Sequence, residues 1–431
     1  MKFRKKYGTL ADRIKGIDAS SSEIVCRPEV FAQAFRYLRG VAIEYMDCST
    51  GENIRVSDLS ITYHVGEDFL DVIDGNWKDH KLILKTYRQF LKTCESVPDS
   101  VLKQCSWCFI DTYYNVACCE SLMKRKKAAV DAFEKAIQYG YYDYAHAQKD
   151  TDLDNVRDDK RFQKAMERLR EVGDFGYILR KSPGYDDAAS TDSLSAFTYM
   201  NPNDRDLVRV RRYFNLDSIA GAGDEISKIK NLLAWVHNTI RHDGSSYNPE
   251  EKNAIALYEI CKKEERGVNC RMMAQMLNEC YLAMGFKSRY VTCLPKSYIN
   301  DCHVINVVYS NTLDKWLWVD PTWNAYVMDD KGNLLSISEV RDRLKKGEFV
   351  TVNEDANWNH KTPCTNDYYL DYYMSKNLYY LQCSDCSGFN NETYVEGKRR
   401  PVYITLSPTG EPYDKRWSTS NESWFWASPY K

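Results

Sequence analysis

Three residues in the second half of the chain, Cys270, His303 and Asp320, are of the types that nucleophilic chemistry needs. Cys270 stands in the stretch RGVNCRMMAQMLNECYLAMGF, residues 266–286. Apolar residues spaced three and four apart predict one face of a helix, which Gly285 ends. These residues are Cys270, Met273, Leu277, Cys280 and Met284. The free N–H groups and dipole of a helix N-terminus favour an anion, which suits a thiolate nucleophile. The same position also suits one more buried thiol.

His303 and Asp320 are predicted to meet on a β-hairpin. The runs HVINVVY, residues 303–309, and KWLWVD, residues 315–320, have strand-like composition and flank the polar turn SNTLD. Folding the chain about the middle of that turn places His303 opposite or nearly opposite Asp320 on one face. The carboxylate then fixes the imidazole tautomer, and the imidazole can act as the base for a nearby thiol.

With these residues in this order, the sequence resembles the transglutaminase-like superfamily, whose members carry a Cys, His, Asp triad on a papain-like fold. The matching residues are Cys270 in RGVNCRMMAQ, His303 in DCHVINVVY and Asp320 in WVDPTW. The resemblance covers roughly residues 205–330, including the helix EISKIKNLLAWVHNTIRHDG and the strand GFKSRYV. It implies a nucleophile, a base and an orienting carboxylate, in that order, without a metal ion or a cofactor.

The residues before Cys270 depart from the pattern of many members, which have glycine, one residue and then cysteine. Here two residues separate Gly267 from Cys270. An oxyanion in this fold would be stabilised by the Cys270 backbone N–H and by a second donor from upstream. Trp235 is a candidate for that donor, although its apolar neighbours favour a core role, and Asn269 and His242 are substitutes.

Two other cysteines in this region are predicted to be structural. Cys302 precedes His303 on the same strand and should point to the opposite face, where packing is its expected role. Cys280 lies on the buried stripe of the cysteine helix and is expected in the core. The acidic stretch MDDKGN, residues 328–333, lacks the full calcium-loop spacing and predicts a turn.

The elements that must position these side chains predict an α+β fold. We expect a helical N-terminal half followed by a transglutaminase-like, papain-like cysteine-enzyme domain with an antiparallel sheet. The divisions are a helical region over residues 1–100, tetratricopeptide-like helices over residues 101–175 and the transglutaminase-like domain over residues 176–431. Apolar periodicity predicts helices over residues 28–46 and 80–95.

The segment YYNVACCESLMKRKKAAVDAFEKAIQYGYYD resembles a tetratricopeptide unit. It has small residues where two antiparallel helices approach, a basic turn at residues 124–127 and Gly140 as the C-cap. The continuation AHAQKDTDLDNVRDDKRFQKAMERL resembles the tail that closes such arrays in bacterial proteins. An unrelated helical hairpin is the alternative. The N-terminal helices would serve as a docking surface for a protein partner or as a lid.

Two later segments complete the predicted organisation. The polar stretch RKSPGYDDAASTDS, residues 180–193, is interpreted as a linker or an exposed loop. The last hundred residues predict another helix followed by strands that extend the sheet. Their tyrosines and tryptophans could line a substrate groove, but packing explains them as well and is the preferred interpretation.

Composition and charge exclude several classes of protein. The 431 residues carry a formal net charge of −2, which gives no support to a nucleic-acid or anionic-membrane partner. The basic opening MKFRKKYG is not followed by an apolar run of about 7 to 15 residues, so the sequence predicts neither a signal peptide nor a membrane span. If Met1 is the native start we expect a cytoplasmic protein, and an exported one if a signal peptide has been removed.

Cysteine usage points to a reducing compartment, because the 15 cysteines are an odd number in a chain too long to need disulfides. The pairs CSWC, residues 105–108, and CSDC, residues 383–386, could together bind zinc. They lie far apart in sequence, and Cys105 and Cys108 are expected on a helix instead.

The function expected from the resemblance is cysteine-dependent acyl transfer at an amide carbonyl. Hydrolysis of a peptide or protein amide, as in a peptidase or amidase, is the first choice, because no calcium motif points to the cross-linking class. Amine transfer, as in a protein cross-linking transglutaminase, is the second. A non-catalytic binding or scaffold protein on the same fold is the alternative from another class. A zinc- or redox-controlled thiol protein built on the two cysteine pairs is the third.

Overall fold

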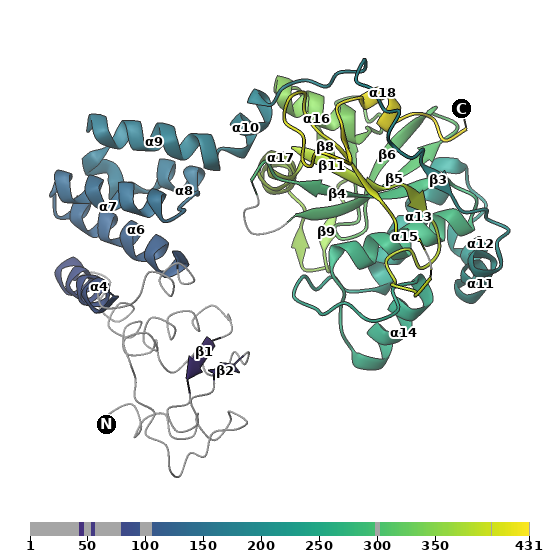
Figure 1. Ribbon diagram of the computed structural model, residues 1–431, viewed down its shortest axis with the longest axis horizontal. Helices are drawn as coiled ribbons and strands as arrows, with labels where there is room; N and C mark the ends of the chain where they lie inside the picture. The colour runs from purple at the N-terminus through teal and green to yellow at the C-terminus, as the bar shows by residue number, and fades with distance from the viewer. Residues whose placement is uncertain are drawn as a thin grey trace, which may run out of the picture. The chain divides into compact units, whose positions relative to one another are not determined.

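A computed structural model describes residues 43–46, 53–56, 79–94, 106–297, 302–397 and 399–430. The chain divides into two compact units, Met1–Asp174 and Phe175–Lys431, each of which is described by itself (Figure 1). The first unit is mainly helical where it is described, and the second contains a large sheet covered by helices. The predicted α+β fold class is therefore confirmed.

The described start of the first unit differs from the prediction. Strands β1, Ile43–Met46, and β2, Asn53–Val56, form an antiparallel pair in which Tyr45 lies beside Ile54. The predicted helix over residues 28–46 is therefore wrong at its last four residues, and its remainder lies outside the described residues. Alternating polar and apolar residues in both segments suit a strand pair, in which side chains repeat every second residue.

A helical hairpin forms the core of the first unit. The helices are α4, His80–Cys94, α6, Ser106–Leu122, α7, Lys126–Gln138, α8, Tyr144–Lys149, and α9, Lys160–Gly173, with a 3₁₀ turn η2 at Thr151–Val156. Small residues on α7, including Ala129 and Ala132, are buried, and Gly140 follows the helix with φ +106°. The helix predicted over residues 80–95 and the helical hairpin are confirmed. Its identity as a tetratricopeptide repeat stays a prediction.

The second unit is built on an eight-stranded sheet, counted over its described residues, with the order β14-β13-β11-β4-β5-β6-β7-β8. The central strands are β11, Tyr380–Ser384, β4, Ser288–Leu294, β5, His303–Ser310, and β6, Lys315–Asp320. The outer strands are β14, Ser418–Thr419, β13, Tyr403–Leu406, β7, Ala325–Met328, and β8, Thr351–Val352. All neighbours are antiparallel except β13 and β14, so the predicted antiparallel sheet is confirmed apart from that edge.

Helices cover both faces of this sheet, which divides the core into two (Figure 1). One face packs on α11, Arg205–Phe214, α12, Leu216–Ala220, α13, Glu225–Thr239, α14, Ala254–Glu264, and α15, Cys270–Ala283. The other packs on α10, Phe175–Lys181, α16, Ile337–Lys346, the π-helical turn η3, Asp367–Met374, and α18, Glu422–Phe425. On β6, Leu317 faces the first layer and Trp318 the second, which explains why these strands are apolar at consecutive positions.

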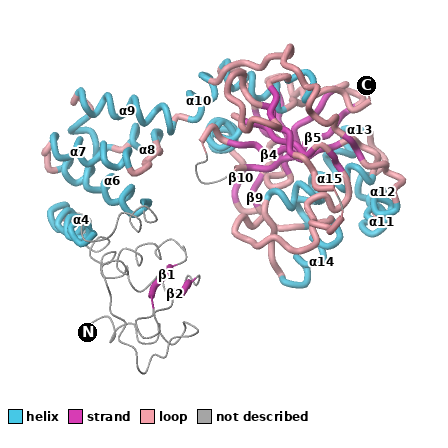
Figure 2. The backbone as a smooth tube through the Cα atoms, in the orientation of Figure 1, coloured by secondary structure: helices cyan, strands magenta, loops and turns pink. Residues whose placement is uncertain are grey.

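Short elements complete the second unit, and loops join its strands around the sheet (Figure 2). They are β3, Thr198–Tyr199, paired with β12, Cys386–Ser387, then β9, Asn357–Trp358, paired with β10, Thr362–Pro363, and the helical turn α17, Ser375–Asn377. Of the predicted loop over residues 180–193, Arg180 and Lys181 end α10, and the remainder is a loop tied to the same unit. Ser423 donates to Asp187, and the Asp186 N–H donates to the carbonyl of Ser420. Within the described part of the chain, no helix has the length and apolarity needed to cross a membrane.

Candidate active site

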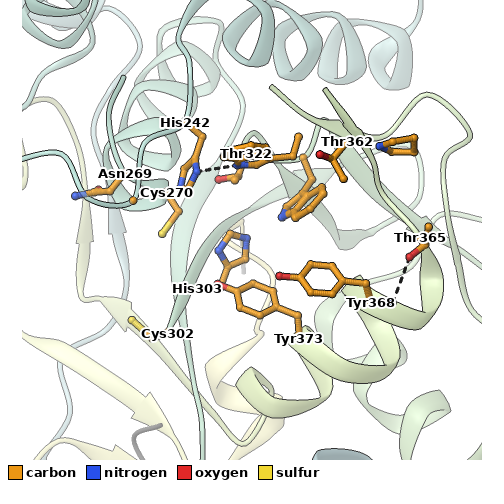
Figure 3. A pocket seen from close by; sticks show the side chains of 14 residues that line it. His242, Asn269, Cys270, Cys302, His303, Thr322, Thr362, Thr365, Tyr368 and Tyr373 are labelled. Carbon is orange, nitrogen blue, oxygen red and sulfur yellow. Dashed lines mark hydrogen bonds between the residues drawn. The ribbon is translucent and has the colours of Figure 1, made fainter. Parts of the chain in front are cut away.

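Cys270 is the first residue of α15, and its position follows from the helix cap before it. The Asn269 side chain accepts a hydrogen bond from the Met272 backbone N–H at 3.1 Å, which starts the helix at Cys270. The thiol is half-buried and opens into a pocket of about 570 Å³. In Figure 3 the Cys270 sulfur points toward the space between the imidazoles of His242 and His303.

The hairpin of β5 and β6 brings His303 to Asp320 as predicted. The turn lies within residues 310–315, and the register places Val307 beside Trp318, so that His303 and Asp320 share one face two positions apart along the ladder. His303 Nε2 lies 2.6 Å from Asp320 Oδ2, and both side chains are buried. With the Nε2–H directed to the carboxylate, Nδ1 of His303 is left to face the thiol side of the pocket.

Asp320 receives two further hydrogen bonds that sequence reasoning missed. Tyr369 on η3 donates its hydroxyl to Asp320 Oδ2 at 2.6 Å, and the Thr322 backbone N–H donates to Oδ1 at 2.8 Å. Trp318 in turn donates its indole N–H to the Tyr369 oxygen at 3.3 Å. A carboxylate with no exposed surface is thus held by donors from three segments, which keeps its charge stable without water.

The electrostatics of the three groups favour a thiolate and an imidazolium. Burial opposes the charge on Cys270, but hydrogen bonding to His242 and His303 and the attraction of the His303 charge lower its pKa to about 6. Burial also opposes the charge on His303, but the charge of Asp320 and their hydrogen bond raise its pKa to about 10. Burial opposes the charge on Asp320, and His303 together with Tyr369 keeps its pKa below the ordinary range. Both shifts favour the proton on His303 over the proton on the Cys270 thiol.

A short parallel contact of two backbone segments holds His242 beside Cys270. The Val268 N–H donates to the Arg241 carbonyl at 3.0 Å, and the Asp243 N–H donates to the Val268 carbonyl at 2.8 Å. This approach requires Gly267, because a Cβ there would lie 2.5 Å from the Arg241 carbonyl oxygen. The close backbone contact at Gly267, whose spacing to Cys270 is one residue longer than expected, therefore holds His242 beside the cysteine helix.

The pocket walls are largely aromatic. Its lining includes Trp323, Trp358, Tyr368 and Tyr373, and the rings of Tyr368 and Tyr373 stack at 6.1 Å (Figure 3). Packing, the interpretation that the sequence favoured for the C-terminal aromatic residues, thus accounts for only part of them. Cys302 packs near Tyr379, as expected of a structural residue, but it also lines the pocket.

The candidates for a second oxyanion donor separate clearly. Trp235 packs against Phe214 in the helical core and does not line the pocket. Asn269 lines the pocket, but its oxygen caps α15 and its amide group donates to Asn248 at 2.7 Å. Its local sequence, an asparagine directly before a helix, already carries the signal of a cap. His242 remains, since it lines the pocket and hydrogen-bonds to the Cys270 thiol.

Among the described cysteines, Cys280 and Cys383 have the surroundings expected of structural thiols. Cys280 has no exposed surface, and burial raises its pKa well above the ordinary value. Cys383 is buried in β11, and Cys386 lies near the Asn391 side chain. Of the other pair, Cys105 lies outside the described residues and Cys108 belongs to α6. The zinc site therefore stays a prediction.

One further group of metal-binding types lies in the first unit. Ligand atoms of Cys118, Asp150 and Asp152 lie within 4.8 Å of one another. Asp150, however, already accepts the Asp152 backbone N–H at 3.0 Å and the Tyr114 hydroxyl at 2.7 Å. These bonds cap η2 and tie it to α6, which is a structural use of the carboxylate.

Comparisons with known proteins find matches over part of the chain. A sequence model of the transglutaminase-like superfamily matches residues 213–321, a segment that contains Cys270, His303 and Asp320. A stretch of 58 residues is 36% identical to a chloroplastic protein of Arabidopsis thaliana and covers 14% of this chain and 17% of that protein.

A solved structure from Cytophaga hutchinsonii, proposed in its name as a cysteine protease, is 17% identical with a TM-score of 0.23, over 34% of this chain and 48% of that one. A TM-score this low does not establish a shared fold. The chain thus spans less than half of the length of either protein. The superfamily match supports a cysteine-dependent enzyme in general terms.

Proposed function

We propose that the second unit is a thiol hydrolase that cleaves a peptide or amide bond, with Cys270 as nucleophile. The observation that carries this proposal is that Cys270 and His303 line one pocket and that His303 is bonded to the fully buried Asp320 carboxylate at 2.6 Å. A cysteine with a pKa of about 6 is about 90% thiolate at pH 7, whereas an ordinary thiol of pKa 9.0 is about 1% thiolate. This difference makes the sulfur reactive at neutral pH.

The reaction begins when the Cys270 thiolate attacks the carbonyl carbon and forms a C–S bond. His303 gives its Nδ1 proton to the leaving nitrogen as the C–N bond breaks, which leaves a thioester and a free amine. His303 Nδ1 then takes a proton from water, the hydroxide adds to the thioester, and the thiolate leaves with its electron pair. Asp320 keeps the Nε2–H of His303 in place throughout both steps.

The walls of the pocket support an uncharged side chain next to the bond that is cut. Its aromatic lining includes Trp323, Tyr368 and Tyr373, and its titratable groups among the described residues are two imidazoles, two thiols and those tyrosines. A charged substrate side chain would lose hydration there without gaining an ion pair with a lysine, arginine or carboxylate. We therefore propose peptides with apolar or aromatic residues at the cleavage site.

The test is a peptide library incubated with the full chain, analysed by mass spectrometry with and without a primary alkylamine. Hydrolysed products that vanish in Cys270→Ala and persist in Cys302→Ser support the proposal, since Cys302 supplies a second thiol to the same pocket. Amine adducts in place of acids would favour the transferase. Absence of both products, with Cys270 unreactive toward acyl donors, would favour the scaffold and contradict the proposal.

A further inference from the structure

Hydrogen bonds from two other segments hold the backbone of His242 at the pocket. Its backbone N–H donates to Asn359 Oδ1 at 2.8 Å, and its carbonyl accepts from Asn359 Nδ2 at 2.9 Å. Asn359 has φ +51°, a left-handed conformation that asparagine tolerates better than most residues. The segment after β9 therefore holds the backbone of His242 from one side, while Val268 holds it from the other.

The tautomer of His242 is fixed by a tryptophan. The indole N–H of Trp358 donates to His242 Nδ1 at 3.0 Å. An indole nitrogen can only donate, so Nδ1 must be the acceptor and the proton of the neutral ring must sit on Nε2. The two rings also meet edge to face, with centroids 6.2 Å apart.

We propose that His242 is a second catalytic imidazole, whose Nε2–H donates to the thiolate of Cys270 in the resting site and to the carbonyl oxygen during attack. This inference rests on the proposed acyl transfer and adds a donor to it. As the C–S bond forms, negative charge leaves sulfur and appears on oxygen. A fixed donor beside the sulfur is then close to the atom that gains the charge.

The two imidazoles of the pocket thus have opposite orientations and different tasks. His303 turns its Nε2–H toward Asp320 and presents Nδ1 to move a proton, whereas His242 turns Nδ1 toward Trp358 and presents a fixed N–H. The backbone N–H of Cys270, in the first turn of α15, supplies the companion donor, because helix geometry gives it no intrahelical acceptor.

Two reactions of Cys270 separate this role from support of the thiolate. Acetylation by p-nitrophenyl acetate forms a C–S bond, releases p-nitrophenolate and passes through an oxyanion. Alkylation by iodoacetamide displaces iodide and forms no oxyanion. The ratio of the two rates at Cys270, located by mass spectrometry, therefore reports the oxyanion donors alone. The variants are His242→Ala, His242→Gln and, as a remote control for losing an imidazole, His146→Ala.

We expect the ratio to fall about 10²- to 10³-fold in His242→Ala and to recover to within about tenfold in His242→Gln, whose amide keeps a donor. The control should match the wild type. An unchanged ratio in His242→Ala, or equal losses of both rates, would overturn the inference while leaving the proposed hydrolase intact. Wild-type Cys270 that alkylates but is never acetylated would overturn both.

Trp358 is the positioning residue of this pair, and it has its own readout. Trp358→Phe keeps the ring but removes the N–H, so Nδ1 of His242 is free to carry the proton. Nitrogen-15 spectra should then show a mixture of His242 tautomers, and the ratio of acetylation to alkylation should fall. A variant that keeps the Nε2–H tautomer and the full ratio would contradict the positioning role.

Discussion

Asp320→Asn is the substitution that tests the hydrogen-bond geometry of the site in most detail. Three donors converge on the carboxylate: His303 and Tyr369 on Oδ2 and the Thr322 N–H on Oδ1. An amide offers one oxygen and one NH₂ group. If the amide oxygen faces His303, the NH₂ group meets the Thr322 N–H, which is also a donor. If the amide oxygen faces Thr322, the NH₂ group meets the Nε2–H of His303, again a donor.

Relief of the second clash moves the His303 proton to Nδ1, which then no longer accepts the thiol proton. Loss of the Asp320 charge also removes the main attraction that raises the pKa of His303. The pKa of Cys270 should rise from about 6 toward 9.0, and the thiolate fraction at pH 7 should fall from about 90% to about 1%. We expect acetylation of Cys270 at pH 7 to fall at least about 10²-fold.

The assay is the acetylation burst with p-nitrophenyl acetate at pH 7, with thermal unfolding measured in parallel. Asp329→Asn is the matched control, because Asp329 accepts the Lys331 and Asn333 N–H groups in a turn that does not line the pocket. The control should lose some stability and no reactivity. An Asp320→Asn variant that reacts at the wild-type rate would refute the role of the carboxylate.

Three further predictions concern the surroundings of the triad. Gly267→Ala should cut acetylation at least about tenfold and lower the free energy of unfolding by about 1 to 3 kcal/mol, because the new Cβ must displace the Arg241 carbonyl next to His242. In the control Gly184→Ala the new Cβ meets no atom within 4 Å, so neither acetylation nor stability should change. Tyr369→Phe should lower the free energy of unfolding in urea by about 1.5 to 3 kcal/mol, because it removes a hydrogen bond to the buried charge of Asp320. The control Tyr281→Phe should lower it by about 1 kcal/mol, because it removes a hydrogen bond to the Ile229 carbonyl. Equal losses would argue that Asp320 is uncharged. The acetylation rate should be bell-shaped in pH, falling below about 6 as the thiolate takes up a proton and above about 10 as His303 loses one, and a rate that only rises through pH 9 would argue for an ordinary thiol.

The parts of the site that the sequence predicts are those defined by local patterns. His303 and Asp320 lie 17 positions apart in one hairpin, whose strand-like composition and polar turn specify the register within two positions. The start of the cysteine helix is equally local, since Asn269 caps it and the apolar spacing begins at Cys270. The prediction that Cys280 belongs to the core follows from the same spacing and is confirmed.

The contacts that sequence reasoning missed join segments distant in the chain. Tyr369 reaches Asp320 across 49 positions, and Trp358 reaches His242 across 116. No periodicity relates such positions, and the sequence does not show which tyrosine of the tyrosine-rich segment contacts Asp320. The strand at residues 43–46 was missed for a related reason, because its partner at residues 53–56 decides its conformation.

The most direct test of the thiolate–imidazolium pair is the rate of Cys270 alkylation by iodoacetamide against pH, in the wild type and in His303→Ala, with the site located by mass spectrometry. The pair predicts a wild-type rate that stays high down to about pH 6 and collapses at neutral pH in the variant. A Cys270 that titrates near pH 9, or alkylates equally with and without His303, would contradict the account and identify the residue as a packing thiol.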